Sequence, residues 1–241
     1  MNMDITFGII TNNNINNINI IIDSIEQLNI PNYEIIIIGC NVDLKRKNSL
    51  SIPFNENIYP RWITRKKNII TQHAKYDIIV YLHDYIIFHP GWYEGMIKFG
   101  NNFDVLINPI LNLNGTRFRD WILNINFLRG KFLINGNRKT PIINAPDEWI
   151  QQNENVIQKY NINEKLQTHF LDYDNDGKYL QNYIYISGSY FIAKKYVMEK
   201  FPLNENLLHG QGEDVVWIQN FRDIYNISFN KYSLNKLLKN K

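Results

Sequence analysis

The sequence has very little cysteine and lacks any long apolar run. Cys40 is its single cysteine, so an internal disulfide is excluded and a reducing compartment is favoured. The first residues, Met-Asn-Met-Asp-Ile, lack the basic region and apolar core of a signal peptide, and no apolar run approaches the ~20 residues that a membrane span needs. We therefore expect a cytoplasmic protein with no membrane span, in which Cys40 is a buried structural thiol.

A strong excess of charge is also missing. The chain of 241 residues carries 26 basic and 23 acidic side chains, a net charge of +3, which gives no electrostatic reason to expect a nucleic-acid partner. Local basic clusters can still hold a diphosphate. The length suits one large α/β domain, and we expect a partner that is small or neutral.

The first part of the chain alternates between strand and helix patterns. Strands are predicted over Ile5 to Thr11 and Tyr33 to Gly39, with a helix over Ile15 to Leu28 between them. This order predicts a right-handed crossover in a parallel sheet. No Gly-x-Gly-x-x-Gly follows the first strand, so a dinucleotide site is not expected. The same turn lacks the Gly-rich basic loop typical of sugar-phosphate nucleotidylyltransferases.

The most informative stretch is a central strand with polar residues at its end. Ile78 to Leu82 is short, apolar and rich in β-branched residues, which predicts a strand buried on both faces. His83 and Asp84 follow it directly, at the carboxyl edge where open α/β sheets bind ligands. Pro90-Gly91 then interrupts the chain before a helix predicted over Trp92 to Phe99. The alternative is that His83 and Asp84 only cap the strand.

Later segments add three smaller patterns. Asp104 to Ile110 and Tyr183 to Ala193 are predicted strands, the second with a Ser-Gly-Ser interruption that can mark close approach by a ligand. His-Gly-Gln-Gly-Glu-Asp over 209–214 opens a helix predicted to run to about Phe221. A basic tail from Lys231 either closes over a bound diphosphate or frays.

These segments together resemble the GT-A glycosyltransferases of the family 2 type. Lys67-Asn68, Ala74 and Asp77 match the basic-Asn, helix, Ala-x-x-Asp, strand run of that family, with a helix expected over Asn68 to Ala74. The central strand of those enzymes ends in an Asp-x-Asp motif that holds a divalent metal on the diphosphate of a nucleotide sugar. The Gly-Glu-Asp segment resembles the turn that presents an acidic pair to their acceptor.

The motif is altered in this chain. Alignment on Trp92 places His83 and Tyr85 at the two usual aspartates, with Asp84 between them. The resemblance implies a Mn²⁺ or Mg²⁺ ion on Asp84, with His83 as a candidate ligand because manganese accepts imidazole as well as oxygen. His209 is a further candidate ligand, because a late histidine is often the extra metal ligand in that superfamily.

The resemblance also implies which residues bind the two substrates. The expected donor-binding residues are Thr11, Asn12, Asn41, Asp43, Arg65, Lys67, His83 and Asp84. The Arg-rich segment after the Asn-Gly turn supplies groups suited to a sugar acceptor, namely Arg117, Arg119, Asp120 and Trp121. Asp214 and Glu213 are the expected catalytic pair, since one carboxylate can accept the proton of an acceptor hydroxyl. The alternatives are ordinary turn residues, an ion pair beside a packed Trp, and a helix cap.

We therefore expect an α/β protein with a single GT-A domain over residues 1–241, in which a mixed, mostly parallel sheet is flanked by helices. Residues 1–100 would bind the nucleotide sugar and residues 101–241 the acceptor. Over-use of Asn and Ile is typical of AT-rich genomes. Together with His-Asp-Tyr over 83–85 and Arg-Phe-Arg-Asp-Trp over 117–121, this composition resembles transferases of giant viruses, a group with enzymes that add glucose to galactosyl-hydroxylysine of collagen-like proteins.

The expected function is metal-dependent transfer of a sugar, best glucose, from a UDP-sugar to a hydroxyl of a glycan or glycoprotein. The alternative is a catalytically inactive binding protein on a degenerate GT-A scaffold. The sequence leaves the oligomeric state, monomer or homodimer, open.

Overall fold

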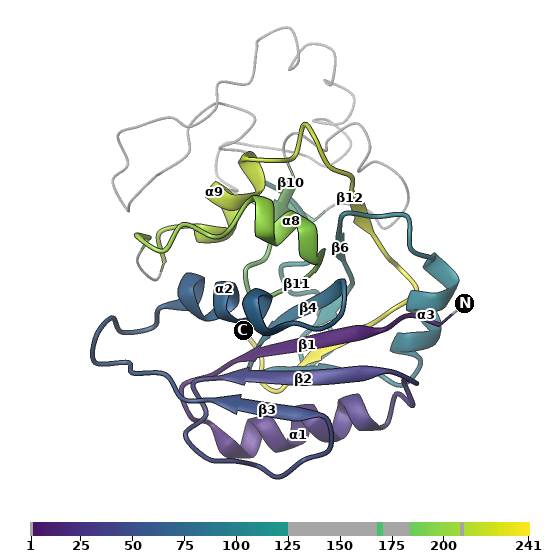
Figure 1. Ribbon diagram of the computed structural model, residues 1–241. Coiled ribbons are helices and arrows are strands. Elements are labelled where there is room, and N and C mark those ends of the chain that lie inside the picture. The colour runs from purple at the N-terminus through teal and green to yellow at the C-terminus, as the bar shows by residue number, and fades with distance from the viewer. Residues whose placement is uncertain (1, 125–167, 171–183, 208–209) are drawn as a thin grey trace, which may run out of the picture.

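The computed structural model describes residues 2–124, 168–170, 184–207 and 210–241. A seven-stranded sheet lies at its centre (Figure 1). From one edge to the other, its strands are β12 (Ile227–Phe229), β6 (Val105–Ile107), β11 (Tyr190–Lys194), β4 (Ile78–His83), β1 (Ile5–Ile10), β2 (Tyr33–Ile38) and β3 (Ser49–Ile52).

The direction of the strands makes the sheet mixed and mostly parallel. β11 is antiparallel to both of its neighbours, β4 and β6, and the other neighbouring pairs are parallel. From β1 the chain runs outward to β2 and β3 and then returns to β4 on the opposite side of β1. The strand order therefore reverses between β1 and β4, which is the position where sheets of this kind bind ligands.

Helices cover both faces of the sheet. They are α1 (Ile15–Glu26), α2 (Ile63–His73), α3 (Trp92–Phe99), α8 (Lys195–Lys200) and α9 (Glu213–Gln219). Figure 1 shows α1 on one side of the sheet and α2 with α8 on the other. Along β4, Ile79 and Tyr81 pack with the α2, α8 and α9 side, whereas Val80 and Leu82 pack with the α1 and α3 side. The expectation of a strand buried on both faces is confirmed.

Two three-stranded sheets complete the described part. The first consists, in spatial order, of β5 (Ile86–Phe88), β13 (Asn235–Leu237) and β7 (Ile110–Leu111). The second consists of β10 (Ile184–Ile186), β8 (Trp121–Asn124) and β9 (Thr168–Phe170). The first of these sheets places the C-terminal segment beside the chain that leaves β4. The backbone N–H of Leu238 donates to the carbonyl of Tyr85 at 2.8 Å, so the basic tail is held at the end of β4 and not frayed.

The structure differs from the sequence expectations at three element boundaries. The strand expected over Asp104 to Ile110 divides into β6 and β7 because Pro109 has no N–H for a continuous ladder. The strand expected over Tyr183 to Ala193 divides into β10 and β11 at the Ser-Gly-Ser turn. Helix α2 begins at Ile63, ahead of the expected Asn68, and the indole of Trp62 before it donates to the carbonyl of Glu205 at 2.8 Å.

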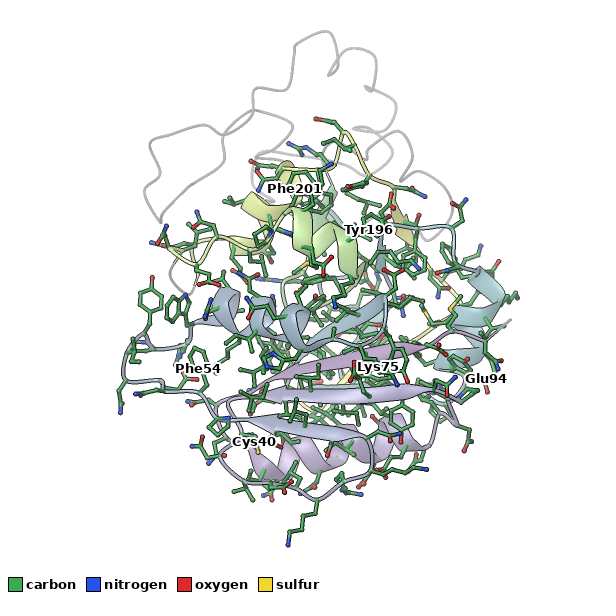
Figure 2. The ribbon with its side chains drawn as sticks, in the orientation of Figure 1. Cys40, Phe54, Lys75, Glu94, Tyr196 and Phe201 are labelled. Atoms are coloured by element: carbon green, nitrogen blue, oxygen red, sulfur yellow. The ribbon has the colours of Figure 1, made fainter. Side chains whose placement is uncertain are left out.

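Two expectations from composition can be compared with the described residues. Cys40, labelled in Figure 2 just after β2, is a fully buried free thiol, as expected. No helix within the described ranges combines the length and the apolar character needed to cross a bilayer.

Candidate active site

The carboxyl edge of the central sheet carries two adjoining cavities. We call the first the Asp84 cavity; it has about 420 Å³ and is lined by Ile10, Thr11, Asn12, Glu56, Arg61, Ile63, Lys66, His83, Asp84, Tyr85 and Lys239. The second, the Glu213 cavity, has about 390 Å³ and is lined by Ile63, His83, Tyr85, Arg119, Ser187, Gly188, Ser189, Gly210, Gly212, Glu213, Asp214 and Lys241. The cavities share Ile63, His83 and Tyr85, so they adjoin along these residues, and we call the two together the cleft.

Asp84 is fixed where the strand order reverses. The hydroxyl of Thr11, which follows β1, donates to Asp84 Oδ2 at 2.6 Å. The amide of Asn17 in α1 donates to the Asp84 carbonyl at 2.7 Å. These contacts tie the end of β4 to β1 and to α1. The Asp84 carboxylate lines the cavity and is partly exposed, which leaves it accessible to a ligand.

Lys66 is a cleft residue that the sequence reasoning missed. Its side chain is 95% buried, donates to the Thr11 carbonyl at 2.6 Å and pairs with Glu56. Its ammonium also lies 5.0 Å from the ring centroid of Phe54. The helical spacing from Ile63 through Lys66 to Ile70 is the signal that would have found it, since these positions share one helix face.

Lys67 and Arg65 were expected at the diphosphate, and the structure places both away from the cleft surface. Lys67 is fully buried; its ammonium donates to the Gly188 carbonyl at 2.7 Å and lies 3.8 Å from Glu213 Oε1. Burial lowers the pKa of Lys67, and the nearby Glu213 and Asp214 carboxylates oppose that shift. Adjacent residues of a helix point about 100° apart, so Lys66 faces the cleft and Lys67 the core.

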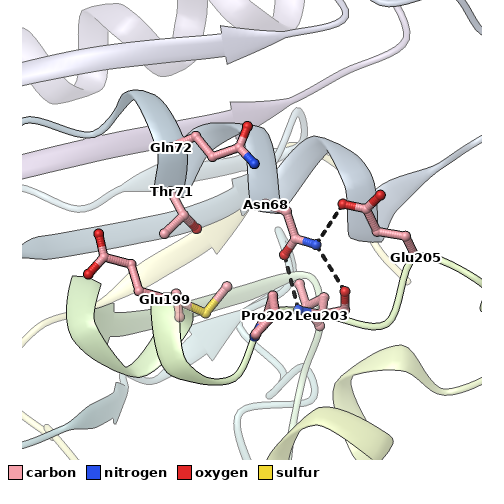
Figure 3. Close-up of a pocket in the computed structure, with 8 residues that line it drawn as sticks. Asn68, Thr71, Gln72, Glu199, Pro202, Leu203 and Glu205 are labelled. Atoms are coloured by element: carbon pink, nitrogen blue, oxygen red, sulfur yellow. Dashed lines mark hydrogen bonds between the residues drawn. The ribbon is translucent and has the colours of Figure 1, made fainter.

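Arg65 and Asn68 hold the segment that follows α8. Arg65 pairs with Glu205 at 3.1 Å. Asn68 donates to the Leu203 carbonyl and to Glu205 Oε1, both at 2.9 Å, and accepts from the Leu203 N–H (Figure 3). This cluster borders a separate hollow of about 500 Å³ between α2 and α8.

Glu213 and Asp214 lie at the start of α9, against the turn that precedes β11. The Gly188 N–H donates to Asp214 Oδ2 at 2.5 Å, and Asp214 is buried. The Glu213 side chain keeps 12% of its surface exposed. A Cβ atom on Gly188 would lie 2.6 Å from Glu213 Oε1 and 2.8 Å from Asp214 Oδ2. Glycine is therefore required for this close approach, and Glu213 is the more accessible of the two carboxylates.

The expected acceptor residues separate into two groups. Arg117 and Asp120 form an ion pair at 2.5 Å, and the fully buried Asp120 also accepts from the Ile110 N–H. That pair stabilises the loop after β7. Arg119 is exposed and lines the Glu213 cavity. Trp121 is the first residue of β8, and its side chain lies outside the described part of the chain.

The expected nucleoside-binding residues are also divided. Thr11 and Asn12 line the Asp84 cavity. Asn41 and Asp43 lie in the exposed turn after β2, where the Asn41 N–H donates to the Asn13 side chain at 3.1 Å and Asp43 accepts from the Lys45 N–H at 3.0 Å. Recognition of a base or ribose by this turn stays a prediction.

The basic tail supplies two more cleft residues. Lys239 lines the Asp84 cavity and Lys241 lines the Glu213 cavity. The Lys241 ammonium lies 3.1 Å from the ring centroid of Tyr85. Partial burial, together with the charges of Lys239 and Arg119, lowers the pKa of Lys241 to about 8, against the opposing effect of Asp84.

The residues around Asp84 can be compared with the needs of a divalent ion. Such cations take several oxygen ligands. The described residues contain no group of three His, Cys, Asp or Glu side chains that could hold a metal, and Asp84 shares its cavity with Lys66 and Lys239. Within the described residues, these side chains do not build a metal site by themselves, so an ion on Asp84 would need ligands from a substrate or from outside the described residues. The other expected ligand, His209, lies outside the described residues.

No protein-family model matches this chain, and neither does any curated protein. Solved structures do match. A crystal structure of S. aureus TarS 1-349 aligns with a TM-score of 0.56 and 11% identity over 96% of this chain and 60% of that one. Structures of the same protein in complex with UDP and with UDP-GlcNAc align with the same TM-score, at 11% and 10% identity, over 98% and 99% of this chain and 61% and 60% of theirs.

This likeness shows the fold alone. The expected GT-A class, with a mixed and mostly parallel sheet flanked by helices, is confirmed. The chain spans about 60% of the length of those TarS structures.

Proposed function

We propose that this protein is a glycosyltransferase that moves a sugar from a nucleotide sugar, best a UDP-sugar, to a hydroxyl of a glycan or glycosylated protein. The observation that carries the proposal is the cleft at the strand-order reversal. One end of that cleft holds Asp84 among cations, and the other end holds the Glu213 and Asp214 carboxylates. The chain also shares its overall fold with TarS structures in complex with UDP and UDP-GlcNAc.

The two cavities suit two substrates. The Asp84 cavity, at the ends of β1 and β4, would take the nucleotide, with Thr11 and Asn12 toward the nucleoside. The Glu213 cavity would take the acceptor, with the Arg119 guanidinium available to its hydroxyls. The donor sugar would lie between them, beside His83 and Tyr85, which line both cavities.

Glu213 is the better candidate for the base that acts on the acceptor. It would take the proton of the acceptor hydroxyl while that oxygen bonds to the anomeric carbon, and the bond from this carbon to the diphosphate would break with its electron pair leaving on UDP. Asp214, held by the Gly188 N–H, would position the turn. Attack on the face opposite UDP would invert the anomeric configuration.

The hypothesis also has finer parts, which concern the sugar, the acceptor and the metal. Glucose as the sugar, galactosyl-hydroxylysine as the acceptor and a Mn²⁺ or Mg²⁺ ion on Asp84 and His209 stay predictions. If a divalent ion binds, it would supply positive charge to the diphosphate. Homodimer formation and a cytoplasmic location stay predictions too.

A second candidate is a binding protein that has lost catalysis on this scaffold. The observation in its favour is that His83 and Tyr85 flank Asp84, where the resemblance would place two metal-binding aspartates. Such a protein would bind UDP or a sugar nucleotide but would not turn it over.

UDP release from a panel of nucleotide sugars, with and without Mn²⁺, separates the two candidates. We expect turnover with at least one UDP-sugar, and Glu213→Gln should lower it about 10²–10⁴-fold with UDP affinity nearly unchanged. The Glu205→Gln variant is the control, because Glu205 pairs with Arg65 outside the cleft. UDP binding without turnover would favour the binding protein, and a fully active Glu213→Gln variant would reject the assigned base.

A further inference from the structure

The C-terminal segment is built into the edge of the cleft. β13 pairs antiparallel with β5, Leu237 opposite Ile86, and parallel with β7. Beyond β13, the Lys241 N–H donates to Asn112 Oδ1 at 2.8 Å. The segment is therefore fixed before and after Lys239, and both of its last lysines reach the cleft.

The two lysines lie on the same aromatic residue. Tyr85 follows Asp84 directly, and its ring centroid is 3.1 Å from the Lys241 ammonium and 5.9 Å from that of Lys239. The Tyr85 hydroxyl shares a hydrogen bond of 2.8 Å with Ser189, and burial raises the pKa of Tyr85. Tyr85 is consequently a neutral, fixed surface, next to Asp84 in the chain, that lies near both ammonium groups.

These lysines differ from the other two lysines near the cleft in their ion pairing. Lys66 is paired with Glu56, and Lys67 lies 3.8 Å from Glu213. Within the described residues, neither Lys239 nor Lys241 has a carboxylate within ion-pair distance, and both side chains are exposed. Their charge is available for an anion, whereas the charge of Lys66 and Lys67 is already balanced.

We infer that Lys239 and Lys241 bind the diphosphate of the donor and stabilise the departing UDP, without a divalent ion. The inference rests on the proposed function, since it assigns the charge that this function needs. An ammonium donates up to three hydrogen bonds to phosphate oxygens, and the lysines reach the cavities on both sides of Tyr85. A diphosphate lying across Tyr85 would contact both.

The low pKa of Lys241 gives this binding a pH dependence. The charged groups that face Lys241 are the Lys239 and Arg119 cations and the Asp84 carboxylate, and Glu213 lines the same cavity. The free protein loses the Lys241 proton above about pH 8, whereas a bound diphosphate favours the charged form. Affinity for UDP should therefore fall as the pH rises above 8, and binding there should take up protons.

Calorimetric titration of the full chain with UDP and with uridine, in EDTA at pH 7, tests the inference. Each single variant, Lys239→Met and Lys241→Met, should weaken UDP binding about tenfold, and the double variant more. Uridine, which has no phosphate, should bind all forms alike. Lys236→Met is the matched control, because Lys236 lies in β13 of the same segment and does not line either cavity.

The outcomes distinguish this inference from the function on which it rests. Two results would overturn the role of the lysines and leave the transferase proposal standing. One is UDP binding that requires Mn²⁺, and the other is a double variant that binds UDP as tightly as the Lys236→Met control does. A wild-type chain that binds neither UDP nor any UDP-sugar, in EDTA or in Mn²⁺, would remove both.

Discussion

The two ends of the cleft differ in how their charged groups are held. At the Glu213 cavity, the acidic groups are held by buried contacts: Lys67 is fully buried behind it, Asp214 is buried, and both bond to Gly188. The cations that line this cavity, Arg119 and Lys241, are exposed. In the Asp84 cavity, Asp84 is fixed by Thr11, but Lys239 is exposed at the rim. The carboxylate pair is organised before any ligand arrives, whereas the exposed lysines of the C-terminal segment keep charge available for a ligand.

This contrast has an energetic meaning. Removing one partner from a buried charged group leaves the other without compensation, which costs stability. An exposed lysine contributes little to stability and can contribute to ligand affinity. Substitutions behind the Glu213 cavity should therefore damage fold and turnover together, whereas those at the Asp84 end should act mainly on binding.

The largest effect is expected for Lys67→Met. The variant keeps the apolar stem but leaves the Gly188 carbonyl without its donor and Glu213 without its nearby cation. We expect a loss of roughly 3 kcal/mol in the free energy of unfolding, together with a large loss of turnover because Glu213 is no longer held. Denaturant titration and UDP release measure the two quantities.

Lys194→Met is the matched control for that variant. Lys194 is also buried, lies 3.3 Å from Asp77, and has an aromatic ring, Phe103, at 5.1 Å, but it is at the opposite end of β11. It should lose less stability than Lys67→Met, because its partner Asp77 is 59% exposed, and it should keep its turnover. Equal turnover in the two variants would contradict a link between Lys67 and the chemical end of the cleft.

An intermediate effect is expected for Gly188→Ala. The added methyl would lie 2.6 Å from Glu213 Oε1, so the carboxylate must move, and overpacking of this kind costs about 1–3 kcal/mol. Turnover should fall more than stability suggests. Gly95→Ala in α3 is the control. Its methyl would collide with the Tyr232 carbonyl oxygen, so this variant should lose stability but keep UDP release. If both alanine variants release UDP at the same rate when folded, the Gly188 contact is only structural.

Much of the fold was predictable from the sequence because its signals are local. The Ile-rich runs of β1, β2 and β4 and the spacing of α1 are patterns of single segments, and each corresponds to an observed element. The parallel pairing of β1 with β2 follows from the short crossover between them, whereas the position of β4 on the other side of β1 does not. The GT-A resemblance drew on these segments, on the Lys67-Asn68 run before β4 and on the Gly-Glu-Asp segment.

The cleft was less predictable because it depends on helix phase and on pairing between distant segments. Lys67 was assigned to the diphosphate from the family resemblance alone. Placing the start of α2 at Asn68 hid the helix face that Ile63 and Lys66 share. The pairing of β13 with β5 joins segments far apart in the chain. This pairing brings Lys239 into the cavity that Asp84 lines, and no local sequence pattern indicates the pairing.

The smallest effect is expected at the Asp84 end, from Thr11→Val. This change removes the hydroxyl that donates to Asp84 Oδ2 and accepts from the Asn14 N–H, at a cost of roughly 1–2 kcal/mol in the free energy of unfolding. Thr6→Val is a close control, since Thr6 donates to Glu34 Oε1 at 2.6 Å from the opposite end of β1. The two valine variants should lose similar stability, but only Thr11→Val should weaken UDP binding, by a few-fold, because only its carboxylate partner faces the cleft. A Thr11→Val variant with wild-type affinity for UDP would place the nucleotide away from the reversal of strand order between β1 and β4.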